Sequence, residues 1–480
     1  MNNSIGRLLM CSAILISMSQ LTLANNFEIG IDKPYASPNQ LYLAQVVQSG
    51  DTISIDGGEY LGKEGLAIWT ANDLLIRGVN GRPHLNAEGQ AIGKKGIWII
   101  AGNNIKVENI EFSHTAVPDK NGAGIRFEGI NLSVSHCYFH HCENGLLTNN
   151  PDTGTIVIEY SEFAYSGYGD GYSHNLYIGH CDQLIFRYNY SHHSSIGHLV
   201  KSRATKNYIY CNRIMDEETG NSSRLIDLPN GGVAIIIGNT LMQGAKAENS
   251  NLIGYGLEGL THAENRFYCV NNTLVNEKPV NGLFIDIAAG TDYTFIANNI
   301  FSGAGKVIKN ITVDSMHNLV SPDINSMYFV NRSTYDYELT ALSPAIDGGA
   351  ALDSAEGYAL LPVDSYVHPV NNKTRIQSGA AIDQGAFEFT PAISHHVLNS
   401  NALAIYPNPV RGVLYISTPG IHLIHPGKLI VSDVSGRIIL QKVITDSVES
   451  LNTSNFPSGI YFVHFITSGE IFNATFICQN

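Results

Sequence analysis

The feature that most constrains the fold is a short β-strand motif that recurs from about residue 41 to 320. Each repeat holds an apolar strand, a turn, and a second strand that ends in a polar residue, in most repeats asparagine. These polar positions are 19 to 33 residues apart, and they are Asn109, His136, Tyr160, Asn189, Asn212, Asn239, Asn272, Asn299 and Asn318. No amphipathic helical stretch lies between them. A period of this length with β signals alone predicts a β-solenoid in which each repeat forms one coil.

The recurrent asparagine has a physical reason. Its amide both donates and accepts hydrogen bonds, so asparagines on successive coils can satisfy one another along the solenoid axis. Asparagine also tolerates the left-handed backbone conformation that a sharp corner requires. The sequence therefore predicts an asparagine ladder at one corner of the coils.

This pattern resembles the right-handed parallel β-helix of the pectate-lyase-like superfamily, over roughly residues 35 to 390. Within it, residues 330–390 are similar to the closing segment of secreted β-helix proteins, with the runs Tyr337-Glu338-Leu339, Ser343-Pro344-Ala345-Ile346-Asp347 and Ile382-Asp383-Gln384-Gly385-Ala386-Phe387-Glu388. We expect this segment to cover the last open edge of the solenoid. Residues 391–401, rich in Ser, Asn and His, are expected to form a linker.

The last eighty residues carry three landmarks, Ala404-Ile405-Tyr406-Pro407-Asn408-Pro409, Val431-Ser432-Asp433-Val434-Ser435-Gly436-Arg437 and Phe456-Pro457-Ser458-Gly459-Ile460-Tyr461-Phe462-Val463. They resemble the C-terminal sorting domain of the type IX secretion system of Bacteroidetes-type bacteria. The resemblance implies that 402–480 is an export address, that the secretion machinery is a partner, and that the protein is secreted or held at the cell surface. Hydrophobic strands alternating with Gly and Pro turns predict a small Ig-like β-sandwich here. The predicted fold class is therefore all-β, a right-handed parallel β-helix followed by this sandwich.

Residues 1–24 have the pattern of a secretory signal peptide. Arg7 precedes a short apolar run from Leu8 to Ile16, and Thr22-Leu23-Ala24 offers small residues for cleavage after Ala24. Cys11 lies inside the apolar run and is interpreted as part of the signal. The run is too short to span a bilayer, and no later stretch approaches the roughly 20 apolar residues that a transmembrane helix needs.

Composition narrows the function classes. A formal net charge of −14 argues against a general nucleic-acid binder, which needs a basic face. Cleavage after Ala24 leaves six of the seven cysteines, without a dense framework or a CxxC pattern. We expect isolated buried thiols, with a Cys137–Cys142 bridge as the alternative, and a monomeric protein.

Strand alternation sorts the first strand of each coil into core-facing and solvent-facing side chains. Tyr177, Lys201 and Asp227 precede the asparagine of their own coils by 11 or 12 residues, so their strands should lie side by side on one sheet. With neighbouring strands about 4.8 Å apart, the stripe spans about five coils, long enough for several sugar units. The side chains predicted to face solvent are Arg126, Glu128, Asn175, Tyr177, Lys201, Arg203, Asp227 and Asp286.

This stripe favours a polysaccharide lyase that cleaves an acidic, uronate-containing polymer by β-elimination. Such chemistry needs a base for the C5 proton, a cation for the carboxylate, and an acid for the leaving oxygen. Lys201 or Tyr177 is the candidate base, and Arg203 or Arg126 the candidate carboxylate clamp. The family resemblance implies comparable Lys, Arg and carboxylate sets, often with Ca²⁺, but no lyase motif of the family maps here residue by residue.

Other residues complete the candidate site. Asp227 joins the catalytic set, and Glu128 and Asn175 the substrate-binding set. His174 and His198 immediately precede site strands and are candidate general bases.

Three further interpretations stay open. The carboxylates Glu128, Asp227, Glu258 and Asp286 include candidate acid–base pairs for a glycoside hydrolase on the same face. Alternatively, Lys201, Arg203 and Asp227 form only a solvated ion-pair ladder. A third class is a non-catalytic surface protein that binds glycans or a host surface.

The loop 165–172 places Tyr168 and Tyr172 among glycines, where their rings are expected to stack on sugars or to pack on the sheet. Histidines cluster at 136–141, 174–180 and 192–198, but their spacing matches no zinc signature, so solvated loop histidines are expected. Ca²⁺ is the candidate cofactor, from Glu128, Asn149, Asp227 or Asp286, although no EF-hand spacing occurs. The metal ligands are not defined by the sequence.

Overall fold

The computed structural model describes residues 24–279, 282–309, 311–390, 403–417, 427–444, 448–467 and 470–479. The chain divides into two compact units, 1–390 and 391–480, which are described separately. The predicted linker 391–401 and nearly all of the predicted signal peptide lie outside the described residues.

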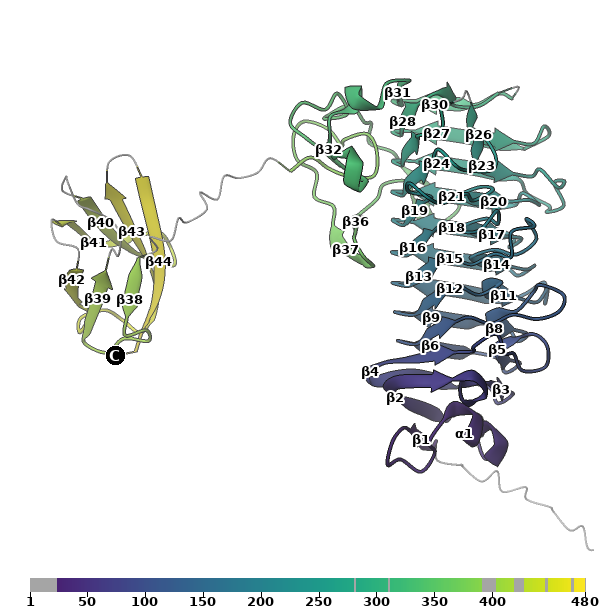
Figure 1. The fold of residues 1–480 in the computed structure, drawn as a ribbon. Coiled ribbons are helices and arrows are strands. Elements are labelled where there is room, and N and C mark those ends of the chain that lie inside the picture. Colours follow the sequence, from purple (N-terminus) through teal and green to yellow (C-terminus); the bar gives the residue numbers. More distant parts are fainter. Residues whose placement is uncertain are drawn as a thin grey trace, which may run out of the picture. The chain divides into compact units, whose positions relative to one another are not determined.

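The first unit is a β-solenoid of about ten turns, which confirms the predicted class (Figure 1). One sheet of parallel strands, called the site sheet below, contributes one strand from each coil. Its strands are β3 (Ala67–Trp69), β5 (Gly96–Ile100), β8 (Ala123–Phe127), β11 (Asn144–Thr148), β14 (Leu176–Ile178), β17 (Val200–Ser202), β20 (Ile226–Leu228), β23 (Asn251–Tyr255), β26 (Gly282–Ile287) and β29 (Gly305–Lys306).

The other strands of the coils form two further parallel stacks. The first holds β6 (Ile105–Glu108), β9 (Leu132–Ser135), β12 (Thr155–Glu159), β15 (Gln183–Arg187), β18 (Lys206–Tyr210), β21 (Val233–Ile237), β24 (Arg266–Val270), β27 (Tyr293–Ala297) and β30 (Asp314–Met316). The second holds β7 (Glu111–Ser113), β10 (Tyr138–His140), β13 (Glu162–Ala164), β16 (Tyr190–His192), β19 (Arg213–Met215), β22 (Thr240–Gln243), β25 (Thr273–Asn276), β28 (Ile300–Gly303) and β31 (Leu319–Ser321). The long strand β4 (Leu75–Asn86) pairs with both β6 and β7 and so joins the two stacks.

The N-terminal end of the solenoid is covered by elements that the repeat pattern does not predict. Strand β1 (Asn26–Ile29) pairs with β2 (Thr52–Leu61), and the short helix α1 (Pro38–Ala44) places Leu41 in the solenoid core. Ser37 starts this helix, because its Oγ accepts a hydrogen bond from the Gln40 amide at 3.3 Å. The 3₁₀ turn η1 (Gly62–Gly65) follows β2.

The predicted asparagine ladder exists, but it begins later than expected. Asn189, Asn212, Asn239, Asn272, Asn299 and Asn318 form it, and each of the first five donates its backbone N–H to the next side-chain oxygen at 2.9 Å. The strand register pairs Glu159 with Arg187, so Ser161 and not Tyr160 occupies the ladder position of its coil. The assignments of Asn109, His136 and Tyr160 to the ladder are therefore wrong by one residue.

The left-handed corner residue is the one before the ladder position. Tyr160, Tyr188 and Cys211 have φ of 48°, 60° and 49°, whereas the ladder asparagines are not left-handed. The corner residue takes the turn, and the residue after it is buried, where its amide can stack on the next coil. The left-handed turn and the stacking of the amide were expected of a single asparagine, but they belong to two successive residues.

All six cysteines of the described residues are buried and free, so the expected isolated thiols are confirmed and the Cys137–Cys142 bridge is not formed.

The segment 330–390 folds back along the flank of the solenoid. It contains η3 (Arg332–Thr334) and three short hairpins, β32 (Phe329–Asn331) with β33 (Asp336–Leu339), β34 (Ser354–Ala355) with β35 (Tyr358–Ala359), and β36 (Asp364–Val367) with β37 (Asn371–Thr374). Tyr188 Oη donates to Asp364 at 2.6 Å, and Gln384 Nε2 donates to the carbonyl of His317 at 2.6 Å. The segment therefore contacts many coils as well as the last ones, which η2 (Ile324–Met327) also touches.

The second unit consists of two antiparallel sheets around one core. One sheet holds β38 (Ala404–Tyr406), β39 (Val413–Ser417) and β42 (Val448–Asn452). The other holds β41 (Ile438–Ile444), β40 (Gly427–Asp433), β43 (Gly459–Thr467) and β44 (Glu470–Cys478).

Candidate functional site

One outward position of the site sheet is aligned from coil to coil. The pairs run from Arg126 to Leu147, Tyr177, Lys201, Asp227, Gly254 and Asp286. The prediction that the strands of Tyr177, Lys201 and Asp227 are neighbours is therefore confirmed. Arg126 lies two coils before Tyr177, so the stripe from Arg126 to Asp227 covers five strands.

Tyr177 lies beside two cations. Arg203 Nε donates a hydrogen bond to Tyr177 Oη at 2.8 Å, and Lys201 Nζ is 5.3 Å from the centre of the Tyr177 ring. The carboxylate of Glu258 bridges these cations, with Oε1 at 3.2 Å from Lys201 Nζ and Oε2 at 2.6 Å from Arg203 Nη2. Burial raises the pKa of Glu258, but the hydrogen bonds from Arg203 and Lys201 outweigh it, so this pKa is below its ordinary value.

Asp227 lies beneath this layer. Its carboxylate is 3.1 Å from Arg224 Nη1, 3.4 Å from His198 Nε2 and 3.7 Å from Lys201 Nζ. Burial raises the pKa of Asp227, against the opposing charges of Arg224 and Lys201. The expectation that Asp227 faces solvent is wrong, since only 1% of it is exposed. Gly254 on the next coil explains this, because a Cβ there would lie 2.9 Å from Asp227 Oδ1 and 3.0 Å from Arg224 Cδ, so its absence lets Arg224 fold over the carboxylate.

His174 and His198 form a stacked pair under Tyr177. Their ring centres are 4.8 Å apart, and His174 Nδ1 accepts a hydrogen bond from the His198 backbone N–H at 2.9 Å. Burial lowers the pKa of both imidazoles well below the ordinary value, and nearby cations add to the effect. Both residues are almost fully buried. They therefore support the site from below as neutral rings, and neither is placed to reach a polymer as a general base.

Asn175 is not a substrate-facing residue, which corrects the prediction. It is fully buried, and its amide donates to the carbonyl groups of Phe163 and His192 at 3.0 and 2.8 Å. The chain bends at Asn175, just before β14, and the aligned position on the neighbouring coil also points inward, since a Cβ on Gly145 would meet Phe139 at 3.2 Å. Inward-facing and outward-facing side chains alternate strictly only from Leu176 onward.

A groove of about 470 Å³ lies beside Tyr177. Its lining includes Arg126, Tyr172 and Asp170 together with Tyr177. Tyr172 is 83% exposed, so the ring is free to contact a ligand. Tyr168 is half-exposed and lies under Lys120, whose Nζ is 4.1 Å from the ring centre.

Glu128 neutralises cations at the far end of the stripe. Its carboxylate pairs with Lys95 and lies 3.5 Å from Arg126 Nε. Asn149 donates from its amide to the Glu128 carbonyl at 2.7 Å, and Asp286 accepts from Asn251 at 2.9 Å. The carboxylates expected as Ca²⁺ ligands are thus engaged in separate contacts, and three cationic or imidazole groups surround Asp227, while Asn149 Oδ1 has no hydrogen-bond partner among the described residues. This donor set does not fit a Ca²⁺ ion.

Sequence reasoning missed two contributors and left one unplaced. Neither Arg224 nor Asn230 was singled out, although Arg224 lies in the polar segment 223–229 and Asn230 directly follows it; Asn230 accepts a hydrogen bond from Arg203. Glu258 was a candidate carboxylate in a loop of unknown position. The loop brings it back over β17, 57 residues earlier in the chain, and no local pattern predicts that return.

Comparison with protein families identifies the tail. Residues 404–479 match the model of the secretion system C-terminal sorting domain. No curated protein matches the chain. Among the described residues, no helix is long and apolar enough to cross a membrane. The chain is therefore a β-solenoid protein that carries a C-terminal type IX secretion sorting domain, and it is secreted or located at the cell surface.

Proposed function

We propose that this protein is a polysaccharide lyase that cleaves uronate linkages of an acidic polymer by β-elimination. The observation that carries the proposal is the setting of Tyr177, which lines an open groove, accepts a hydrogen bond at its hydroxyl from Arg203, and has Lys201 Nζ 5.3 Å from its ring centre. Two cations beside the phenol can attract the carboxylate of a uronate unit.

In this proposal Tyr177 removes the C5 proton. The electron pair of the C5–H bond becomes the C4–C5 double bond, the C4–O4 bond breaks, and the leaving oxygen takes up a proton. Lys201 and Arg203 neutralise the uronate carboxylate, because negative charge moves onto it as the C5 proton leaves. Lys201 is also the candidate donor of the proton to the leaving oxygen.

Glu258 supports the carboxylate part of the proposal. Its two oxygens already contact Lys201 Nζ and Arg203 Nη2, and its side chain is 48% exposed. A uronate carboxylate that replaced it would meet the same two cations. Arg126, which lines the groove two coils from Tyr177, offers a second contact for a carboxylate, and its Nε lies 3.5 Å from Glu128.

A glycoside hydrolase is the second candidate, favoured by the pair Asp227 and Glu258. One oxygen of each lies within 3.7 Å of Lys201 Nζ, so these oxygens are less than about 7 Å apart, an upper bound consistent with the spacing of glycosidase carboxyls. The pKa of Asp227 is raised and that of Glu258 is lowered, as an acid and a base require. Asp227, however, is covered by Lys201 and Arg224, so a glycosidic oxygen has no direct access to it, and we prefer the lyase.

The experiment that tests the proposal uses the purified full chain on pectin, alginate and glycosaminoglycan polymers. A lyase produces unsaturated uronate, which absorbs ultraviolet light, and each assay is run with and without chelator. Reducing ends without the ultraviolet signal would replace the lyase by the hydrolase. Binding without either product would identify a glycan-binding protein, and loss of signal in chelator would bring a metal into the reaction.

A further inference from the structure

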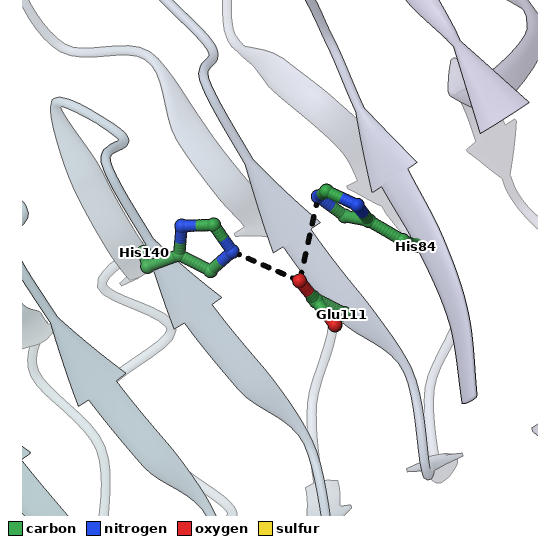
Figure 2. Close-up of side chains that lie close together, drawn as sticks. All are labelled: His84, Glu111 and His140. Atoms are coloured by element: carbon green, nitrogen blue, oxygen red, sulfur yellow. Dashed lines mark hydrogen bonds and ion pairs between the residues drawn. The ribbon is translucent and has the colours of Figure 1, made fainter. Parts of the chain in front are cut away.

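A second group of polar side chains lies on the stack that contains β7 and β10, away from the site sheet. Figure 2 shows the Glu111 carboxylate between the rings of His84 and His140. Glu111 Oε1 is 3.1 Å from His140 Nε2 and 3.5 Å from His84 Nε2. The three residues come from successive coils, on β4, β7 and β10, and their ligand atoms all lie within 4.8 Å of one another. Within the described ranges, no other three His, Cys, Asp or Glu side chains are grouped in this way.

The two histidines direct the same nitrogen toward Glu111, and their other nitrogens have partners of their own. His140 Nδ1 lies 2.7 Å from His141 Nδ1, and His84 Nδ1 lies 3.6 Å from Glu59 Oε1. A proton on each Nδ1 leaves both Nε2 lone pairs available to an ion, and Ser113 Oγ, which lies 2.7 Å from His84 Nε2, would turn aside to admit it. This second layer of contacts on the remote nitrogen is what orients metal-binding histidines in proteins.

We propose that His84, Glu111 and His140 bind a divalent transition-metal ion of the Zn²⁺ class. Bonds of about 2.0–2.2 Å from zinc to imidazole nitrogen and carboxylate oxygen place tetrahedral ligand atoms roughly 3.3–3.6 Å apart. The contacts of Glu111 Oε1 at 3.1 and 3.5 Å require only small adjustments. Imidazole ligands exclude Ca²⁺, which takes oxygen ligands. The side chains are 10% to 23% exposed, so a water molecule can reach the fourth position.

The chain contains a natural comparison for this site two coils further on. His192 Nε2 lies 3.1 Å from Glu162 Oε1, and His192 Nδ1 lies 2.6 Å from His193 Nδ1, which repeats the contacts of His140 with Glu111 and His141. The strand register places Tyr138 beside Glu162, where the first group has His84 beside Glu111. The second group thus repeats the histidine–glutamate pair but lacks the third ligand.

The clusters recognised in the sequence included His140 but not His84. The two residues are 56 positions apart, and only the register of three coils brings them to one carboxylate. The ion would fasten these coils to one another, and the site is independent of the proposed lyase site on the other sheet.

The test is a calorimetric titration of the metal-stripped full chain with ZnCl₂, beside Co²⁺ absorption spectra. We expect one tight site per chain, a visible spectrum of low-symmetry Co²⁺, and a rise in melting temperature with added Zn²⁺. His140→Ala and Glu111→Gln should weaken this site at least 100-fold and abolish the Zn²⁺-dependent rise. His192→Ala is the matched control and should leave both the Zn²⁺ affinity and the Zn²⁺-dependent rise in melting temperature unchanged.

Three results would overturn the proposal. The first is equal weakening by His192→Ala, which would indicate nonspecific binding to histidines. The second is wild-type affinity in Glu111→Gln, and the third is the lack of a tight site in the wild type. If His140→Ala fails to fold, His84→Gln at the more exposed position tests the proposal instead. This variant removes one ligand while keeping a polar side chain of similar size.

Discussion

Arg203 Nε donates to Tyr177 Oη at 2.8 Å, although the two residues are 26 positions apart in the chain. The parallel register makes this contact, because it places Lys201 beside Tyr177 and leaves Arg203 two residues further along the same coil. The phenol is thus held by a side chain of the neighbouring coil. The ladder of the sheet fixes the backbone of Tyr177 and Lys201, whereas Glu258 reaches the site from a loop.

The first prediction concerns the Tyr177 hydroxyl. Tyr177→Phe should lower the rate of elimination by about 10²–10⁴-fold, the usual contribution of a general base or acid. The ring stays in place, so the melting temperature and the binding of polymer should change little. Ultraviolet assays with Tyr328→Phe as control test this, because Tyr328 is half-exposed and far along the chain from the site. Unchanged elimination in Tyr177→Phe would remove this residue from the mechanism.

Glu258→Gln separates the two candidate activities. In a lyase, the carboxylate of Glu258 competes with the substrate for Lys201 and Arg203, so its removal should lower KM several-fold without abolishing kcat. In a hydrolase, Glu258 is one of two essential carboxyls, and the same change should lower kcat by at least about 10³-fold. Steady-state kinetics on the polymer that gives product distinguish the two. Glu248→Gln is a suitable control, since it changes an exposed carboxylate outside the cluster.

Much of this fold was predictable because the solenoid repeats one local rule. The asparagine period fixed the coils, and the alternation of β strands placed Tyr177 beside Lys201. The errors occurred where the local rule changes. Asn175 sits at a bend where two successive residues point inward, and Asp227 is covered by Arg224, which occupies the space left by Gly254. The contact of Glu258 with Lys201 depends on a loop return, and strand periodicity contains no information about that.

The asparagine ladder should be a main source of stability. Asn239 Oδ1 accepts from the Asn212 backbone at 2.9 Å, and its amide donates to the Ile209 carbonyl at 2.9 Å. Asn239→Ala would leave both buried groups unpaired, at about 1–3 kcal/mol each, so we expect a loss of about 3 kcal/mol in unfolding free energy. Urea denaturation measures this, with exposed Asn371→Ala as control. Equal midpoints for the two variants would show that the ladder contributes little.

The last prediction is a loss of stability in mild acid caused by the buried histidine pair. The pKa of both His174 and His198 is lowered well below the ordinary value of 6.5, first by burial and then by neighbouring positive groups. Below about pH 6.5 the unfolded chain therefore binds protons that the folded chain does not. The free energy of unfolding that the two neutral rings contribute is fully present above that pH. It decreases as the pH falls, by up to about 1.4 kcal/mol per pH unit for each ring.

The measurement compares urea midpoints at pH 7.5 and 5.5 for the wild type and His198→Gln. The variant keeps a polar side chain near Asp227 but removes one titrating ring, so its midpoint should fall less between the two pH values. Other histidines with lowered pKa, such as His262 and His368, act in the same direction in both proteins and cancel in the comparison. Asp227 has the opposite sign, because its raised pKa stabilises the fold below its ordinary value of 3.8 and this contribution is lost as the pH rises. An equal fall in both proteins would mean that His198 titrates alike in the folded and unfolded chains, which its burial beside Lys201 and Arg224 argues against.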